Sequence, residues 1–184
     1  VVMNVLVTGG TGFIGKQIID SLLEQGHSVT NLTTQRNQEC VVSQNLQHVY
    51  WNPSTKELRS ELIPAIDGVV HLAGYSVANK WNKANKALMI SSRISSTEFL
   101  CSFLNEMKIS PRVFVGASAS GFYKNSDEIQ DETAEVGSGF LAELTQAWEH
   151  ASSTLNASIT KIHLRIGVVL SANDGALKSA FTQT

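Results

Sequence analysis

The sequence has few of the features that mark a nucleic-acid-binding, disulfide-stabilised or membrane-spanning protein. Its formal net charge is −2, which gives no electrostatic reason to expect nucleic acid or an anionic membrane as a partner. Its two cysteines, Cys40 and Cys101, stand far apart and indicate reduced thiols in a cytoplasmic protein, with a disulfide left open. The five histidines are scattered, which predicts no metal site. No apolar run is long enough to cross a bilayer, and the first residues lead directly into a core strand rather than a signal peptide.

Apolar residues, by contrast, are plentiful. Only 16% of the 184 residues are charged and 42% are hydrophobic, enough to bury a large core. Their spacing predicts strands at 3–8, 28–33, 48–51, 67–74, 111–116 and 159–170, and helices at 13–24, 81–107 and 140–155. This alternation is typical of an α/β protein in which right-handed crossovers place helices on both faces of a parallel sheet. The predicted fold class is therefore α/β with a doubly wound parallel sheet.

A cluster of glycines between the first predicted strand and the first predicted helix is the most specific local pattern. Glycine permits a sharp turn and a close approach of the backbone to a ligand. The amides and the positive dipole of the following helix N-terminus would then face a negative charge. Strand, glycine turn and helix in this order predict a Rossmann-type site for the diphosphate of a dinucleotide. The predicted contacts are Gly9, Gly10, Thr11, Gly12, Phe13, Ile14 and Gly15.

Two further strand ends are expected to complete this binding cleft. The carboxyl ends of parallel strands meet at one edge of a sheet, where ligands bind near the point at which the strand order reverses. Leu72, Ala73 and Gly74 end a buried strand, where small residues let the ribose and nicotinamide of a cofactor approach, with plain core packing as the alternative. Residues 117–120 end the next strand and should line the same cleft as 8–10.

The segment after the second predicted strand contains no carboxylate that could accept hydrogen bonds from the ribose of NAD. Thr33 and Thr34 end that strand instead, and Arg36 follows two positions later. Hydroxyls and a guanidinium suit a 2′-phosphate, so this segment predicts NADP rather than NAD, with these three residues as ligands. A solvated loop cation is the alternative for Arg36.

Three motifs stand in order along the chain: Gly9-x-x-Gly12-x-x-Gly15, His71-Leu-Ala-Gly74 and Ser118-Ala-Ser-Gly-Phe-Tyr123. With them the chain resembles the extended short-chain dehydrogenase/reductases, and within these an atypical branch of nucleotide-sugar epimerases. Further matches to that branch are Trp81, Ser92-Arg93, Asp131-Glu132, Phe140-Leu-Ala-Glu143, Trp148-Glu149, Arg165-x-Gly-Val-Val-Leu170 and Asp174-Gly-Ala.

The resemblance implies transient hydride transfer between a nicotinamide and a small-molecule substrate, such as a nucleotide sugar. It implies that Arg93 faces the cofactor and that Ser118 hydrogen-bonds the substrate. A surface ion pair for Arg93 and a turn-capping role for Ser118 are the alternatives. Tyr123 is the candidate proton donor, with simple packing of its ring at the rim of the site as the alternative.

The resemblance also implies a division of the chain and a set of partners. Residues 1–170 would form the dinucleotide-binding domain, and 171–184 would begin a substrate-binding portion. The expected partners are a small molecule and, for the oligomeric state, a second copy in a homodimer.

One departure leaves the activity open. The catalytic superfamily carries a Tyr-x-x-x-Lys pair on a helix, whereas the corresponding helix here has Phe140 and Leu144, which can neither transfer a proton nor hold a ribose hydroxyl. A non-catalytic dinucleotide-binding sensor or structural protein is therefore the alternative to an enzyme. A flavin dinucleotide site is a third hypothesis, which the Gly-x-x-Gly-x-x-Gly spacing disfavours.

Overall fold

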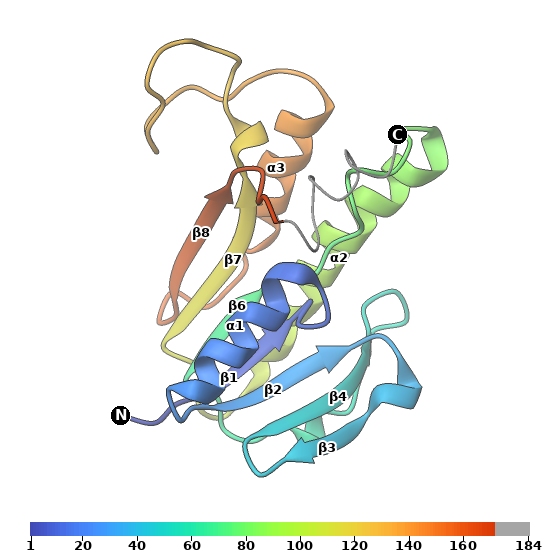
Figure 1. Ribbon diagram of the computed structural model, residues 1–184, viewed down its shortest axis with the longest axis vertical. Coiled ribbons are helices and arrows are strands. Elements are labelled where there is room, and N and C mark those ends of the chain that lie inside the picture. Colours follow the sequence, from blue (N-terminus) through green and yellow to red (C-terminus); the bar gives the residue numbers. More distant parts are fainter. Residues whose placement is uncertain (172–184) are drawn as a thin grey trace.

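The computed structural model describes residues 1–171, which form an eight-stranded sheet with helices on both faces (Figure 1). The elements follow in this order: β1 (Asn4–Thr8), α1 (Phe13–Glu24), β2 (Ser28–Thr33), η1 (Arg36–Gln38), β3 (Cys40–Ser43), β4 (Leu46–Asn52), β5 (Glu57–Leu58), η2 (Ser60–Leu62), β6 (Gly68–His71), α2 (Lys83–Glu106), β7 (Val113–Ala119), η3 (Ser120–Phe122), α3 (Phe140–Ala151) and β8 (Thr160–Ile166).

The strands lie in the order β3-β4-β2-β1-β6-β7-β8, and β5 pairs with β4. Every neighbouring pair from β4 to β8 is parallel, and β3 and β5 run antiparallel to β4. The chain thus winds outwards from β1 in one direction and from β6 in the other. This confirms the doubly wound α/β fold and puts the reversal of strand order between β1 and β6.

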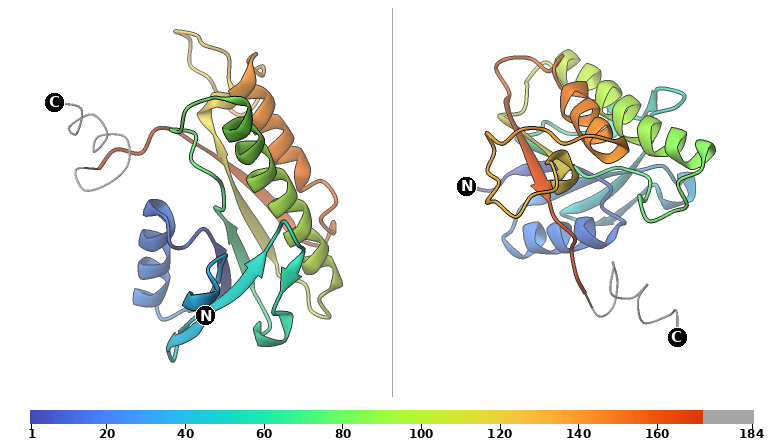
Figure 2. Two further views of the ribbon diagram at one scale, coloured as in Figure 1. Left: turned by 90° about the vertical axis from the view of Figure 1, so that its right-hand side faces the viewer. Right: turned by 90° about the horizontal axis from the view of Figure 1, so that it is seen from above.

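Helices cover the two faces unequally. Figure 2 shows α1 on one face of the sheet and α2 with α3 on the other. Alternate residues of β1 point to opposite faces: Leu6 belongs to the larger core under α2, and Val5 and Val7 pack with Ile19 of α1. Burial on both sides explains why β1 is an uninterrupted apolar run.

The structure corrects the predicted elements mainly at their ends. The antiparallel strands β3 and β5 were not predicted, because β5 has only two residues and β3 is an exposed Cys-Val-Val-Ser segment without alternation of apolar and polar residues. Strand β7 continues to Ala119, past the predicted end at 116, whereas β8 ends at Ile166 rather than at 170. Helix α3 ends at Ala151, where the hydroxyl of Ser152 donates to the carbonyl of Glu149 and competes with further helix. The predicted substrate-binding portion, 171–184, lies outside the described residues except for its first residue.

A buried chain of hydrogen bonds joins β1, β6 and α2 at the reversal point. The ring of His71 is 2.7 Å from the hydroxyl of Thr8 through Nδ1 and 2.8 Å from that of Thr97 through Nε2. His71 is fully buried, and this burial lowers its pKa to about 3. Its imidazole is therefore neutral at physiological pH and serves to fix the edge of the sheet where the three elements meet.

Candidate functional site

Packing accounts for three of the four glycines that follow β1. Gly9 has a φ of +72°, and a Cβ there would lie 2.8 Å from the carbonyl carbon of Leu72. A Cβ on Gly10 would overlap the amide oxygen of Asn31, which accepts a hydrogen bond from the Gly10 amide at 3.2 Å. A Cβ on Gly15 would overlap the carbonyl oxygen of Gly9. These glycines let the turn, β2 and α1 pack closely.

Gly12 differs from the other three. Its φ of −78° and ψ of 172° are extended, a conformation that any residue adopts. A Cβ there would meet only the carbonyl oxygen of Gly9 within 4 Å, at 3.3 Å, a close contact that a small adjustment relieves. Gly12 is the N-cap of α1 and supplies no side-chain cap, and the first turn carries no acidic residue. The backbone amides at this helix end are therefore left open towards an anion.

Two cavities open at the carboxyl edge of the sheet, on either side of Gly74. The first, the β2-side cavity, has a volume of about 460 Å³, and no charged side chain from the described part of the chain lines it. It brings together six of the predicted cofactor contacts: Gly9, Thr11, Thr33, Thr34, Ala73 and Gly74. Its wall also contains Trp51 and Asn52 at the end of β4 and serines of α2, which sequence reasoning missed because these residues are brought to the edge only by the strand order.

Arg36 lies outside the lining of this cavity. Its guanidinium donates to both carboxylate oxygens of Glu57, at 2.6 and 2.8 Å, and stacks over the ring of Tyr50 at 4.2 Å. The hydrogen bond with Glu57 raises the pKa of Arg36. Its side chain is two-thirds exposed, so the ion pair is readily exchanged for another anion.

The second cavity, the β7-side cavity, has a volume of about 590 Å³ and lies between the ends of β6, β7 and β8 and the helix α3. Its polar lining includes Ser120, Thr145 and Arg93, and among residues 1–171 Arg93 is the one charged residue that lines it. A Cβ on Gly74 would lie 3.0 Å from the guanidinium carbon of Arg93. Gly74 and Arg93 therefore meet at the boundary between the two cavities.

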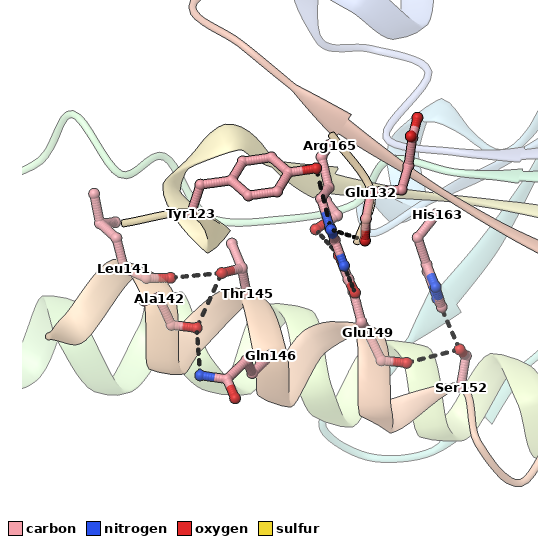
Figure 3. A network of polar contacts seen from close by, with 11 residues as sticks. Tyr123, Glu132, Leu141, Ala142, Thr145, Gln146, Glu149, Ser152, His163 and Arg165 are labelled. Carbon is pink, nitrogen blue, oxygen red and sulfur yellow. Dashed lines mark hydrogen bonds and ion pairs between the residues drawn. The ribbon is translucent and has the colours of Figure 1, made fainter. Parts of the chain in front are cut away.

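The two predicted catalytic residues, Ser118 and Tyr123, are both hydrogen-bonded to an ion pair between α3 and β8. Figure 3 shows this ion pair with Tyr123 beside it. The guanidinium of Arg165 donates to both oxygens of Glu149, at 2.9 and 3.1 Å, and to the phenol oxygen of Tyr123 at 3.1 Å. The hydroxyl of Ser118 donates to Glu149 at 2.6 Å. Burial opposes the ionisation of Glu149, but the hydrogen bonds from Arg165 and Ser118 outweigh it and lower the pKa of the carboxyl.

Neither Ser118 nor Tyr123 is part of the lining of the two cavities. Ser118 is 3% exposed and points towards α3, whereas Ser120, two residues later, lines the β7-side cavity. The sequence did not predict that Arg165 binds Glu149 and Tyr123, although Arg165 lies in one of the motifs that carry the resemblance. A charged residue within a strand pattern was the available signal, since a buried charge requires a partner.

Apolar packing fills the positions of the absent Tyr-x-x-x-Lys pair. The ring of Phe140 makes an edge contact with Trp81 at 5.5 Å between centroids, and the ammonium of Lys86 lies 4.8 Å from the same ring. Leu144 is 4% exposed and lines the β7-side cavity.

Residues 1–171 contain no helix long and apolar enough to cross a membrane. Within the same residues, no group of three His, Cys, Asp or Glu side chains is arranged to hold a metal ion. Cys40 is exposed, Cys101 is buried, and both are free thiols.

The strand order, the glycine turn and the cavities at the carboxyl edge of the sheet are typical of a Rossmann-type fold. The model of the NAD dependent epimerase/dehydratase family matches residues 5–144. The chain therefore belongs to the NAD-dependent epimerase/dehydratase family.

Named relatives agree with this assignment. The epimerase family protein YfhF of Bacillus subtilis is 33% identical over 178 residues, which are 95% of this chain and 57% of the relative. The human epimerase family protein SDR39U1 (isoform 2), solved with NADPH, superposes with a TM-score of 0.82 at 28% identity over 98% of this chain and 59% of that one. A nucleoside-diphosphate sugar epimerase from Corynebacterium glutamicum gives a TM-score of 0.79 at 30% identity over 99% of this chain and 37% of that one. The chain thus spans a little over half the length of the curated relatives it matches.

Proposed function

We propose that this chain binds NADP at the glycine turn and the β2-side cavity, and acts as an epimerase-like oxidoreductase on a small molecule such as a nucleotide sugar. Gly12 carries the proposal. Neither its backbone conformation nor its packing requires glycine, unlike Gly9, Gly10 and Gly15. The open backbone at the N-terminus of α1 is accounted for by a ligand that approaches it closely, and a diphosphate suits both the free amides and the helix dipole.

The absence of charge in the β2-side cavity supports NADP over NAD. Within residues 1–171 no carboxylate lines the cavity at Thr33 and Thr34, so no negative side chain of these residues would repel a 2′-phosphate there. Arg36 would supply the cation by exchanging Glu57 for the phosphate. Arg36→Gln is then expected to lower the ratio of NADPH to NADH affinity by about tenfold, without shifting the unfolding midpoint, because the ion pair is exposed. An unchanged ratio would remove Arg36 from the site. The human relative solved with NADPH is consistent with this preference.

The nicotinamide would supply hydride transfer, and the residues of the chain would orient the reacting groups. The β7-side cavity is proposed to hold the substrate next to the end of β7. The hydroxyl proton of Ser118 is already donated to Glu149, so this hydroxyl can only accept a hydrogen bond from a substrate group that reaches it. The phenol oxygen of Tyr123 accepts from Arg165, which leaves its proton available for donation.

A non-catalytic sensor is the second candidate, favoured by the apolar side chains of Phe140 and Leu144 at the positions of the catalytic pair. The two candidates share the cofactor site and differ in turnover. Incubation with NADP and a set of sugar nucleotides, including UDP-glucose and UDP-glucuronic acid, is expected to give epimerised product or reduced cofactor if the chain is an enzyme. Tight cofactor binding without either product would favour the sensor.

Gly12→Asp tests the cofactor site. Asp is a good N-cap and its charge complements the dipole of α1, so the variant is expected to unfold at the same or a higher urea concentration. The same charge would occupy the diphosphate position and should weaken NADPH binding by at least about 100-fold in calorimetry. Gly12→Ala, with a small neutral side chain, is the matched control and should show a smaller loss. Equal NADPH affinity in all three proteins would refute the proposed site.

The expected homodimer and the cytoplasmic location stay predictions. Light scattering with and without NADPH would measure the oligomeric state.

A further inference from the structure

Two serines near the end of β7 have different surroundings. Side chains alternate between the faces of a strand, and within β7 this alternation points Ser118 towards α3, where it meets Glu149. The strand ends at Ala119, so the alternation no longer applies to Ser120, the first residue of η3. Ser118 is buried, whereas Ser120 is exposed and lines the β7-side cavity. The end of the strand therefore brings Ser120, and not Ser118, to the wall of this cavity.

The position of Ser120 is fixed through the main chain. Its carbonyl oxygen accepts a hydrogen bond from the amide of Tyr123 at 3.1 Å, which closes η3. Gly121 follows, and a Cβ there would lie 3.3 Å from the Cβ of Leu141 in α3. The glycine therefore lets η3 lie directly against α3. These contacts hold Ser120 at the cavity and leave its hydroxyl free to rotate.

Ser120 has the one hydroxyl of the β7-side cavity that lacks a hydrogen-bond partner within residues 1–171. Thr145 donates its proton to two carbonyl oxygens of the preceding turn of α3, at 2.9 and 3.0 Å (Figure 3). The hydroxyl oxygen of Ser76 accepts from the amide of Ala78 at 3.3 Å. An exposed hydroxyl whose proton and lone pairs are both unused is available to a ligand in the cavity.

The proposed hydride transfer requires a hydrogen bond that can change direction. A substrate alcohol can donate a hydrogen bond, whereas the carbonyl formed from it can only accept one. A hydroxyl that is free to rotate suits both forms, because it accepts from the alcohol and donates to the carbonyl. Ser118 cannot do this without breaking the charge-assisted hydrogen bond of 2.6 Å that it donates to the carboxylate of Glu149. Ser120 has no such bond to break.

We propose that Ser120 is the side chain that hydrogen-bonds the reacting oxygen of the substrate. Ser118, which the resemblance implies in this role, instead stabilises the cluster of Glu149 and Arg165. This inference rests on the proposed function, because it assigns a substrate contact within the β7-side cavity. Ser120 forms no covalent bond in the reaction: it orients the substrate oxygen in both the alcohol and the carbonyl form.

Substitutions of Ser120 test whether its hydroxyl contacts the substrate. UDP-glucose and UDP-glucuronic acid are titrated into the full chain saturated with NADPH, and their dissociation constants are measured by ligand-observed NMR. NADPH is already reduced, so a sugar alcohol binds without being oxidised. Ser120→Ala removes one hydrogen bond and is expected to weaken the binding of at least one sugar nucleotide by about 5–10-fold. Ser120→Thr keeps a hydroxyl and should retain the affinity to within about twofold.

The unfolding of the same variants tests the contrast between the two serines without any ligand. Ser118→Ala removes a hydrogen bond from the partly buried carboxylate of Glu149 and should lower the urea midpoint of unfolding. Ser120→Ala should leave the midpoint unchanged, because its hydroxyl has no partner within residues 1–171. Ser118→Ala should weaken sugar-nucleotide binding less than Ser120→Ala does. Ser153→Ala, at an exposed serine after α3, is the matched control and should change neither quantity.

Three results would overturn the inference and leave the proposed function in place. The first is sugar-nucleotide binding that Ser120→Ala does not weaken. The second is an equal loss in Ser120→Thr, which would mean that the shape of the side chain matters and not its hydroxyl. The third is a larger loss of affinity in Ser118→Ala with an unchanged urea midpoint, which would return the substrate contact to Ser118. Binding of neither sugar nucleotide by the wild-type protein would instead refute the proposed substrate, and the inference with it.

Discussion

The glycine turn after β1 and the polar cluster between β7, α3 and β8 are built in opposite ways. The turn excludes side chains, so that backbone atoms of neighbouring segments meet directly, as Gly15 does with the carbonyl of Gly9. The cluster instead collects side chains from three elements around one ion pair, Glu149 with Arg165. The turn is defined by residues close in sequence, and the cluster by residues that only the sheet brings together.

Because of this difference, the turn and the cluster would contribute different things to the site. A turn made of backbone offers main-chain amides, whose interaction with an anion does not depend on the identity of side chains. A cluster made of side chains fixes the orientation of Ser118 and Tyr123, and with it the chemistry that the site could support. Single substitutions should therefore disrupt the packing of one region while leaving the contacts of the other intact.

The largest effect is expected from Gly10→Val in the turn. The added side chain would overlap the amide oxygen of Asn31 and the end of Ile19, both in closely packed positions. We expect the free energy of unfolding to fall by about 3 kcal/mol or more, measured by urea denaturation. Gly12→Ala, two residues away, should change it by less than about 1 kcal/mol, because a Cβ there meets only one atom at 3.3 Å. Equal losses in the two variants would contradict the distinction between the glycines.

In the cluster, Arg165→Met is expected to lower the free energy of unfolding by about 2–4 kcal/mol, since it leaves Glu149 charged and largely buried with no cation beside it and only the hydrogen bond from Ser118. Glu149→Gln should cost less, because an amide can still accept from Ser118. The double variant should lose less than the sum of the two, which a double-mutant cycle measures. Strict additivity would show that the ion pair does not couple the two residues.

His71, at the junction between the regions, gives an effect that is absent at neutral pH and grows as the pH falls. The folded state keeps its imidazole neutral down to a pKa of about 3, whereas the unfolded chain takes up a proton near pH 6.5. Because the unfolded state then binds more protons, the stability contributed by His71 is present above pH 6.5 and is lost as the pH falls towards 3. The slope approaches about 1.4 kcal/mol per pH unit.

His71→Gln removes that titration while keeping a donor and an acceptor. Urea denaturation at pH 7, 6 and 5 should therefore give a shallower loss of stability on acidification than in the wild-type protein. If the free energy of unfolding fell equally with pH in the two proteins, His71 would have to take up its proton in the folded state without loss of stability.

The sequence allowed the turn to be predicted far better than the cluster. Helix α1 and strand β2 have the predicted bounds, because glycine turns and apolar periodicity act over a few residues. The edge strand β3 was missed because it buries nothing. Arg165 and Glu149 are separated by sixteen residues and meet only after β8 has paired with β7, next to Ser118. No local pattern could have predicted that contact, nor that Ser120 rather than Ser118 lines the β7-side cavity.

The hydrogen-bonded row from Thr8 through His71 to Thr97 has a fixed polarity. The hydroxyl proton of Thr97 is donated to the carbonyl of Arg93 at 2.7 Å, so its oxygen must accept from Nε2–H of His71. Nδ1 of His71 is then without a proton and accepts from the hydroxyl of Thr8, whose oxygen in turn accepts from the amides of residues 72 and 73. Each proton in the row therefore has one position, and reversal would remove the hydrogen bond that Thr97 donates to the Arg93 carbonyl, which would keep the hydrogen bond from the hydroxyl of Ser96. The row therefore has a structural role and does not conduct protons. Its hydrogen bonds hold α2, which carries Arg93, against β1, which leads into the glycine turn. A movement of α2 relative to β1, and so of the walls of the two cavities, would break them.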